Sequence, residues 1–277
     1  MNGLKRTRLL EILESFKGLS VMVVGDFALD VYWYADMTRS DLSRETPHYT
    51  RPVIRETYSP GASGNISCNV KALGVNEVFA VTALGEDWRG QILKEKLEEN
   101  GILLDYLIES PERVTSTYIK PILCGWDSQQ EDSRLDFINY EPLSDALEKK
   151  LIKNIRSVVP RVDAVIVEDQ MTQNGIVTDN IRENLIQLAE EYPKKVFVAD
   201  SRERIGLFRS MVLKPNIIEA VKAVCPSKDP LGVKADDLVK IGREMQRKAR
   251  RPIYITMSEK GAILITKSDH HHLPAAP

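Results

Sequence analysis

The regular alternation of short apolar runs with amphipathic helical patterns is the feature that most constrains how this chain folds. Buried strands are predicted by the apolar runs at residues 20–24, 78–82, 164–167, 196–199 and 253–256. Helices are predicted by the periodic patterns at residues 92–100, 146–158, 181–191 and 236–248. Such alternation indicates an α/β fold with a mainly parallel sheet and helices packed on its faces.

Two stretches depart from this alternation and predict strands without intervening helices. They cover residues 31–58 and 114–140, and both are rich in the aromatic and β-branched residues that favour a small sheet. Because both leave the pattern between core elements, we expect them to form one flap beside the main sheet. We find no repeat or linker that divides the chain, so a single domain over residues 1–277 is predicted.

Charge and cysteine usage exclude several classes of protein. The 38 basic and 40 acidic residues give a formal charge of −2, which provides no general attraction for nucleic acid. No apolar run approaches the length of a membrane-spanning helix, so neither nucleic acid nor membrane is an expected partner. The three cysteines are odd in number and far apart, which favours reduced thiols and a cytoplasmic location.

Polar and small residues follow the first predicted strand and precede the next helix. Asp26 and Asp30 come just after residues 20–24, and ligands of open parallel sheets bind at the carboxyl ends of strands. Asp30 is therefore a candidate to accept hydrogen bonds from sugar hydroxyls, although capping a turn explains both carboxylates equally well. The loop from Ser59 to Asn65 lets the backbone approach a ligand closely, but many helices begin with small residues only for turn geometry.

A second group of candidates lies in the last third of the sequence. Asn216 and Glu219 stand three residues apart at a predicted helix start, where both side chains can face one magnesium ion through water. An ordinary capping box describes the same pair. Thr256 and Gly261 could line a nucleotide, but a β-hairpin over these residues also needs them.

Taken in order, these motifs resemble the successive landmarks of the ribokinase/PfkB carbohydrate kinases over nearly all 277 residues. The motifs are Gly-Asp-x-x-x-Asp at 25–30, the small-residue loop ending in Asn65, Gly-Glu-Asp-x-x-Gly at 85–90, Asn-x-x-Glu at 216–219 and Thr-x-x-x-x-Gly at 256–261. The resemblance implies a ribokinase-like three-layer sandwich with a β-sheet lid. It also implies ATP and Mg²⁺ as cofactors, a sugar or sugar phosphate as acceptor, and a homodimer through the lid.

The resemblance also implies roles for individual residues. The residues implied to hold the sugar are Asp30, Gly61 and Asn65. Asn216 and Glu219 are implied to bind ATP, and to bind magnesium through water. Three further residues are implied to contact ATP, namely Thr256, Ser258 and Gly261. The sequence departs from the family at two positions, because Ala62 and Ser258 stand where glycine is usual.

Among these kinases, the sequence looks most like those that phosphorylate heptose 7-phosphate for lipopolysaccharide precursor synthesis. The matching segments are residues 30–34, Arg39, residues 45–47 and residues 134–136, whereas residues 38–47 are longer and differently charged than in heptose kinases. Basic side chains of the lid are expected to bind an acceptor phosphate if at least two converge over the cleft; they are Arg39, Arg44, Arg51, Arg55, Lys120 and Arg134. A solvated lid face neutralised by acidic neighbours is the alternative.

Members of this family carry a Gly-Ala-Gly-Asp segment whose Asp deprotonates the acceptor hydroxyl. The 277 residues contain no such segment, so no catalytic residue is assigned within them. We expect this Asp to lie beyond Pro277, which would make the sequence incomplete at its C-terminal end and inactive in phosphoryl transfer. The alternatives are a non-catalytic sugar- or nucleotide-binding relative, and a nucleoside kinase of the same fold with a more apolar cleft.

Overall fold

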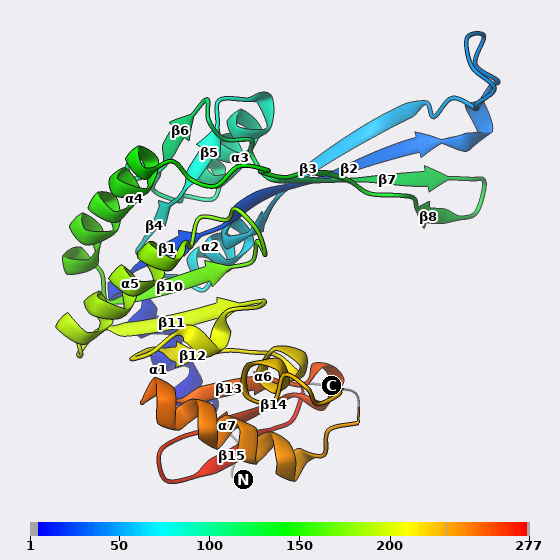
Figure 1. Ribbon diagram of the computed structural model, residues 1–277. Helices are drawn as coiled ribbons and strands as arrows, with labels where there is room; N and C mark the ends of the chain where they lie inside the picture. The colour runs from blue at the N-terminus through cyan, green and yellow to red at the C-terminus, as the bar shows by residue number, and fades with distance from the viewer. Residues whose placement is uncertain (1–4, 231, 276–277) are drawn as a thin grey trace.

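The computed structural model describes residues 5–230 and 232–275 and contains a main sheet of eight strands. The strand order is β15-β14-β13-β12-β11-β10-β1-β4 (Figure 1). Neighbours from β4 to β13 run parallel, whereas β14 and β15 are antiparallel. The strands are β1 (Ser20–Gly25), β4 (Glu77–Val81), β10 (Ala164–Asp169), β11 (Val196–Ser201), β12 (Val212–Leu213), β13 (Ile253–Thr256), β14 (Ala262–Ile265) and β15 (His270–Leu273).

The four helices with predicted bounds, at residues 92–100, 146–158, 181–191 and 236–248, are confirmed as α3, α4, α5 and α7 to within a few residues at each end. The α-helices are α1 (Arg6–Ser15), α2 (Ser63–Ala72), α3 (Trp88–Glu99), α4 (Asp145–Val158), α5 (Asp179–Glu191), α6 (Ile217–Val224) and α7 (Ala235–Ala249). Short 3-10 helices are η1 (Phe16–Gly18), η2 (Met37–Arg39), η3 (Val159–Arg161), η4 (Ile205–Leu207) and η5 (Ser258–Lys260). Within the described ranges, no helix is both long and apolar enough to cross a membrane.

The main sheet has a hydrophobic core on each face because successive strand residues point to opposite sides. On β1, Met22 and Val24 pack in the cluster that includes α4, α5, α6 and α7. Val21 and Val23 pack in the opposite cluster, which includes side chains of α2 and α3. The sheet therefore lies between two helical layers, and the predicted three-layer ribokinase-like fold is confirmed.

A second sheet projects from the body as a long arm, which we call the lid (Figure 1). Its strand order is β3-β2-β7-β8, and β9 also pairs with β7. Its strands are β2 (Phe27–Asp36), β3 (Val53–Ala62), β7 (Thr117–Cys124), β8 (Gln129–Glu131) and β9 (Leu135–Phe137), and a separate parallel pair is β5 (Ala83–Gly85) with β6 (Ile108–Ser110). Because β2 begins just after β1 ends, the lid starts directly at the edge of the main sheet where its parallel strands terminate.

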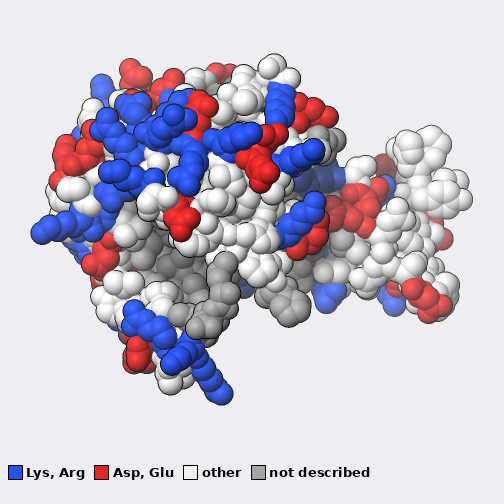
Figure 2. Space-filling model, turned by 90° about the horizontal axis from the view of Figure 1, so that it is seen from below, with Lys and Arg blue, Asp and Glu red and all other residues white. Residues whose placement is uncertain are grey.

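Acidic and basic side chains are interspersed on the face of the molecule that Figure 2 shows. Several of the surface charges form local ion pairs, such as Arg209 with Glu183 and Lys248 with Glu244. Exposed pairs of this kind have short-range fields in salt and contribute little to stability. Recognition of a charged ligand must therefore come from a local arrangement of side chains.

Candidate functional site

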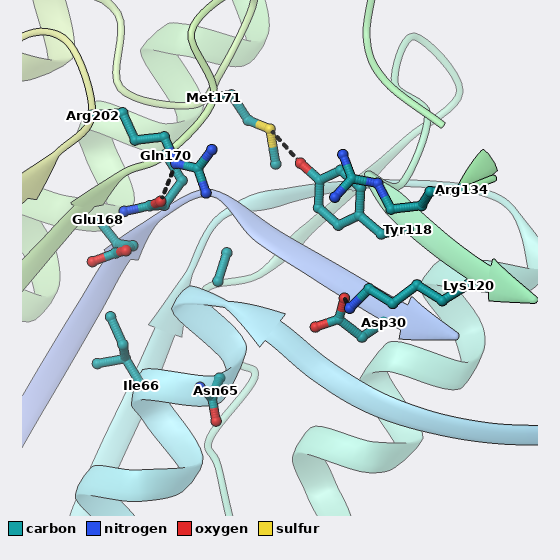
Figure 3. Close-up of a pocket in the computed structure, with 11 residues that line it drawn as sticks. Asp30, Asn65, Ile66, Tyr118, Lys120, Arg134, Glu168, Gln170, Met171 and Arg202 are labelled. Atoms are coloured by element: carbon teal, nitrogen blue, oxygen red, sulfur yellow. Dashed lines mark hydrogen bonds and ion pairs between the residues drawn. The ribbon is translucent and has the colours of Figure 1, made fainter. Parts of the chain in front are cut away.

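A polar cavity of about 370 Å³ lies between the main sheet and the base of the lid. The side chains that line it come from β2, β7, α2, the end of β3, the residue before β9, the end of β10 and the segments that follow β10 and β11 (Figure 3). Asp30 and Asn65, two of the residues implied to hold a sugar, both line this cavity. The complete lining is Asp30, Ala62, Asn65, Ile66, Tyr118, Lys120, Arg134, Glu168, Gln170, Met171 and Arg202. We refer to it as the acceptor cavity, after the role that the family resemblance implies for Asp30 and Asn65.

Asp30 is held by a neighbouring strand of the lid. Parallel pairing of β2 with β7 places Asp30 opposite Tyr118, and Lys120 reaches back so that its Nζ lies 2.9 Å from Asp30 Oδ1. The Lys120 ammonium also donates to the Tyr32 hydroxyl at 3.2 Å. Burial alone would lower the pKa of Lys120, but its bonds to Asp30 and Tyr32 outweigh this effect and raise the pKa. The carboxylate is therefore oriented by a fixed cation before any ligand arrives.

Gly61 does not line the cavity but makes room for Asp30. It pairs with Ala28 across β2 and β3, and a Cβ at Gly61 would lie only 2.7 Å from Asp30 Oδ2. The next residue, Ala62, has φ 48°, a conformation that glycine adopts far more readily. Ala62 therefore has an unfavourable backbone conformation at the position where the resemblance leads us to expect a second glycine.

The structure separates the basic side chains of the lid into two groups. Lys120 and Arg134 line the acceptor cavity, and Arg134 donates two hydrogen bonds of 2.6 Å to the carboxylate of Asp136. Arg39 does not reach the cavity, because its guanidinium pairs with Asp36 one turn away and is 72% exposed. Arg51 pairs with Asp132, Arg55 stacks on Tyr34 with 3.7 Å to the ring centroid, and Arg44 is exposed.

Two strand ends bring further residues to the cavity that the sequence motifs do not identify. Glu168 and Gln170 come from the end of β10, and Arg202 is the first residue beyond β11. Glu168 is only 4% exposed, and its Oε2 has no hydrogen-bond partner among the described residues. Burial, together with the neighbouring Asp200 carboxylate, raises the pKa of Glu168 to about 8. The carboxyl ends of the predicted strands are the signal that could have identified these residues.

Asp26 has a structural role at this edge of the sheet. Its Oδ2 accepts from the backbone N–H groups of Gln170 and Met171, at 2.9 and 2.7 Å, and its Oδ1 accepts from Ile176 at 2.7 Å. Burial raises the pKa of Asp26 to about 6 in spite of these bonds, which favour the ionised form. The alternative explanation of Asp26 as a cap therefore fits the structure, and the loop it caps is residues 170–176, a wall of the acceptor cavity.

A second cavity, of about 560 Å³, adjoins the first at the ends of β11, β12 and β13. We call it the nucleotide cavity, after the role that the family resemblance implies for its residues. Asn216, Glu219 and Thr256 all line it. Asn216 and Glu219 form a complete capping box for α6, with Glu219 N–H to Asn216 Oδ1 at 2.9 Å and Asn216 N–H to Glu219 Oε2 at 2.8 Å. The capping alternative is thus realised, and the same side chains still face the cavity.

The remaining two nucleotide candidates lie at the β13–β14 turn. Ser258 lines a third cavity, which also contains Asn216 and Thr256, so it adjoins the nucleotide cavity. Ser258 has φ 52°, again a conformation that favours the glycine usual at this position. Gly261, with φ 86°, lines none of these cavities, and a Cβ there would overlap the carbonyl oxygen of Leu273. The hairpin geometry alone accounts for Gly261.

The three-layer sandwich, the projecting β lid and the paired polar cavities between them define a ribokinase-like protein. Solved structures of similar fold include Arabidopsis thaliana ribokinase complexed with ribose and ATP, at a TM-score of 0.65 and 17% identity, covering 94% of this chain and 78% of that one. Escherichia coli phosphofructokinase-2 in complex with fructose-6-phosphate gives a TM-score of 0.64 at 14% identity, covering 94% and 80%.

The chain belongs to the pfkB family of carbohydrate kinases, whose profile matches residues 19–277. Among curated proteins, it is 29% identical over 267 residues to the bifunctional protein HldE of Nitrobacter winogradskyi, covering 94% of this chain and 52% of that protein. It is 27% identical to the protein of the same name from a Bradyrhizobium species, covering 93% and 51%. The chain therefore spans about half the length of these curated relatives.

Proposed function

We propose that this chain binds an acceptor and ATP as a kinase that phosphorylates a hydroxyl of a sugar phosphate. The observation that carries the proposal is the lining of the acceptor cavity. Asp30 and Asn65 offer hydrogen-bonding groups for sugar hydroxyls, and Lys120, Arg134 and Arg202 bring positive charge to the same space. A polyol with a phosphate at one end matches this combination.

The polarity of the cavity favours a sugar over a nucleoside as acceptor. Its apolar contributors are few, namely Ala62, Ile66 and Met171, whereas most of the lining is charged or hydrogen-bonding. A nucleoside base would need apolar surface on both of its faces. Heptose 7-phosphate is the acceptor that the segments at 30–34 and 134–136 favour, and the E. coli structure of similar fold carries another sugar phosphate, fructose-6-phosphate.

ATP with Mg²⁺ is the proposed phosphoryl donor, bound in the nucleotide cavity. The cavity offers oxygen atoms from Asn216 and Glu219, and magnesium prefers oxygen ligands while keeping much of its water. These two side chains would hold the ion through water, and the bound ion would neutralise charge on the phosphates. Thr256 and Ser258 would contact the nucleotide beside them. The A. thaliana ribokinase structure of the same fold was determined with ATP.

We also propose that the lid mediates a homodimer. Large apolar side chains are exposed along the lid, including Tyr49 at 69%, Ile54 at 57% and Trp126 at 89%. Exposed apolar surface of this kind marks interaction sites on proteins. A partner lid of the same composition would remove this surface from water.

Binding measurements test the proposed acceptor without requiring turnover. Thermal shifts should be recorded with six- and seven-carbon sugar phosphates and with each parent sugar, because a ligand that binds only the native state raises the unfolding temperature. We expect each preferred sugar phosphate to bind more tightly than its parent sugar, with an advantage that weakens as salt is added.

Arg134→Gln should reduce this advantage, whereas Arg55→Gln, which alters an arginine outside the cavity, should leave it unchanged. Equal affinities of the wild-type protein for a sugar phosphate and its parent sugar would exclude the phosphate subsite and the heptose 7-phosphate assignment with it.

A further inference from the structure

The strand order of the main sheet determines where the two proposed ligands meet. The proposed acceptor residues Asp30 and Asn65 lie near the end of β1, and the proposed nucleotide residues lie at or beyond the ends of β12 and β13. The sheet order places β10 and β11 between β1 and β12. A phosphoryl group that passes from one ligand to the other must therefore lie in front of these central strands.

Arg202 is the first residue beyond β11 and lies at this meeting point. It lines the acceptor cavity, the nucleotide cavity and a further cavity of about 220 Å³ beside Tyr118, and Gln170 is the other residue that lines all three. The positive charge of Arg202 acts on a residue in each binding region. Burial raises the pKa of Tyr118 and that of Glu219, and the charge of Arg202 opposes this rise at both residues. Arg202 thus contributes to both binding regions.

The guanidinium of Arg202 is oriented by one contact and otherwise available. Its Nε donates to Gln170 Oε1 at 2.9 Å, and Figure 3 shows the group directed toward the cavity. Within residues 5–230 and 232–275, its two terminal nitrogens make no hydrogen bond or ion pair. The other cations of the acceptor cavity differ, since Lys120 is paired with Asp30 and Arg134 with Asp136.

We propose that Arg202 binds the terminal phosphoryl group of ATP in the bound complex. The inference rests on the proposed kinase function and adds a specific contact to it. An arginine whose Nε is already fixed presents its two terminal N–H groups in a fork that matches two phosphate oxygens. Gln170 is a positioning residue on this account, because it orients the guanidinium from the neighbouring strand end.

The test compares two nucleotides that differ by the group in question. Dissociation constants are measured with Mg²⁺ for ADP and for the non-hydrolysable β,γ-imido analogue of ATP, by calorimetry. Arg202→Gln is expected to weaken binding of the analogue at least about 10-fold, the effect of one charge-assisted contact, and to leave ADP binding within about 2-fold. Arg202→Lys should lose part of the affinity, since it keeps the charge without the fork.

Arg209→Gln is the matched control, because Arg209 is a surface arginine of the following segment that pairs with Glu183 and lines none of these cavities. Unchanged binding of the analogue by Arg202→Gln, or equal weakening of both nucleotides, would overturn the inference. Loss of sugar phosphate binding with normal nucleotide discrimination would also overturn it, by placing Arg202 on the acceptor. If the wild-type protein bound neither nucleotide, the proposed function itself would fail.

Discussion

Glu168 gives the clearest test of how this sheet edge is built, since its carboxyl group is held where ionisation is unfavourable. It pairs in register with Asp200 on the adjacent parallel strand, so the two carboxyl groups lie on the same face of the sheet. The side chain is 4% exposed, and Lys214, the nearby cation, is itself paired with Asp200. Burial first and Asp200 second raise the pKa of Glu168 from 4.5 to about 8.

The sign of the effect on stability follows from this direction. Because the folded state binds the Glu168 proton more tightly than the unfolded state, the neutral carboxyl favours folding, and this contribution is lost as pH rises from 4.5 to about 8. Glu168→Gln keeps a neutral side chain of nearly the same shape at every pH. The variant should therefore gain stability relative to the wild type between about pH 6 and about pH 8.5, by on the order of 2 kcal/mol.

Urea unfolding at the two pH values gives the free energy of unfolding of each protein. The change with pH in the wild type is then compared with the change in the variant, so that titrating groups common to both proteins cancel. Glu203→Gln is the control, because Glu203 is an exposed carboxylate near the same strand ends. Its unfolding free energy should follow that of the wild type at both pH values. Parallel pH profiles for Glu168→Gln and the wild type would show that the carboxyl group is solvated, and would refute the reasoning from burial and from Asp200.

Three further outcomes are expected. Asp30→Ala should abolish sugar binding in the thermal-shift assay while the protein stays folded by circular dichroism; unchanged affinity would remove Asp30 from the acceptor site. Purified residues 1–277 should transfer phosphate from ATP slowly, because they contain no Gly-Ala-Gly-Asp sequence and a missing general base costs about 10²- to 10⁴-fold in rate; robust acceptor-dependent ADP release would contradict this. The protein should sediment as a dimer that Trp126→Asp, made on a side chain 89% exposed, converts to monomer; a wild-type monomer at micromolar concentration would exclude the lid interface.

Much of the fold could be predicted because the information is local. The apolar runs identify β1, β4, β10, β11 and β13, and the helical periods identify α3, α4, α5 and α7, since burial on one or two faces imposes its period on the sequence. The strand ends then point to Asp30, and the small-residue loop points to Asn65, and both line the acceptor cavity. The Asn216 and Glu219 pair fits two explanations in the sequence, and the structure shows one of them, the capping box, directly.

The parts that could not be predicted depend on long-range arrangement. The lateral order of strands, which brings Arg202 between the two cavities, is set by how helices pack on the sheet and leaves no periodic signal. Arg39 is a residue that the sequence places near the acceptor and that the structure places elsewhere. Its position in the sequence does not show in which direction its side chain extends, and an ion pair with Asp36 holds that side chain away from the cavity. The end of the predicted strand at 164–167 indicates only the region of Glu168, because a single carboxylate there has no motif that would assign it a role.

The bonds of Asp26 to residues 170–176 also determine when the acceptor cavity can form during folding. The lid strands all lie within the first 140 residues, yet the amide groups that Asp26 binds are 144 to 150 residues further along the sequence. Contacts of such sequence separation form slowly, because the entropy of closing a long loop opposes them. On a ribosome, the lid strands are therefore synthesised well before residues 170–176, which form the opposite wall of the acceptor cavity. A ligand of this cavity can stabilise the nascent protein only after β10 has paired with β1.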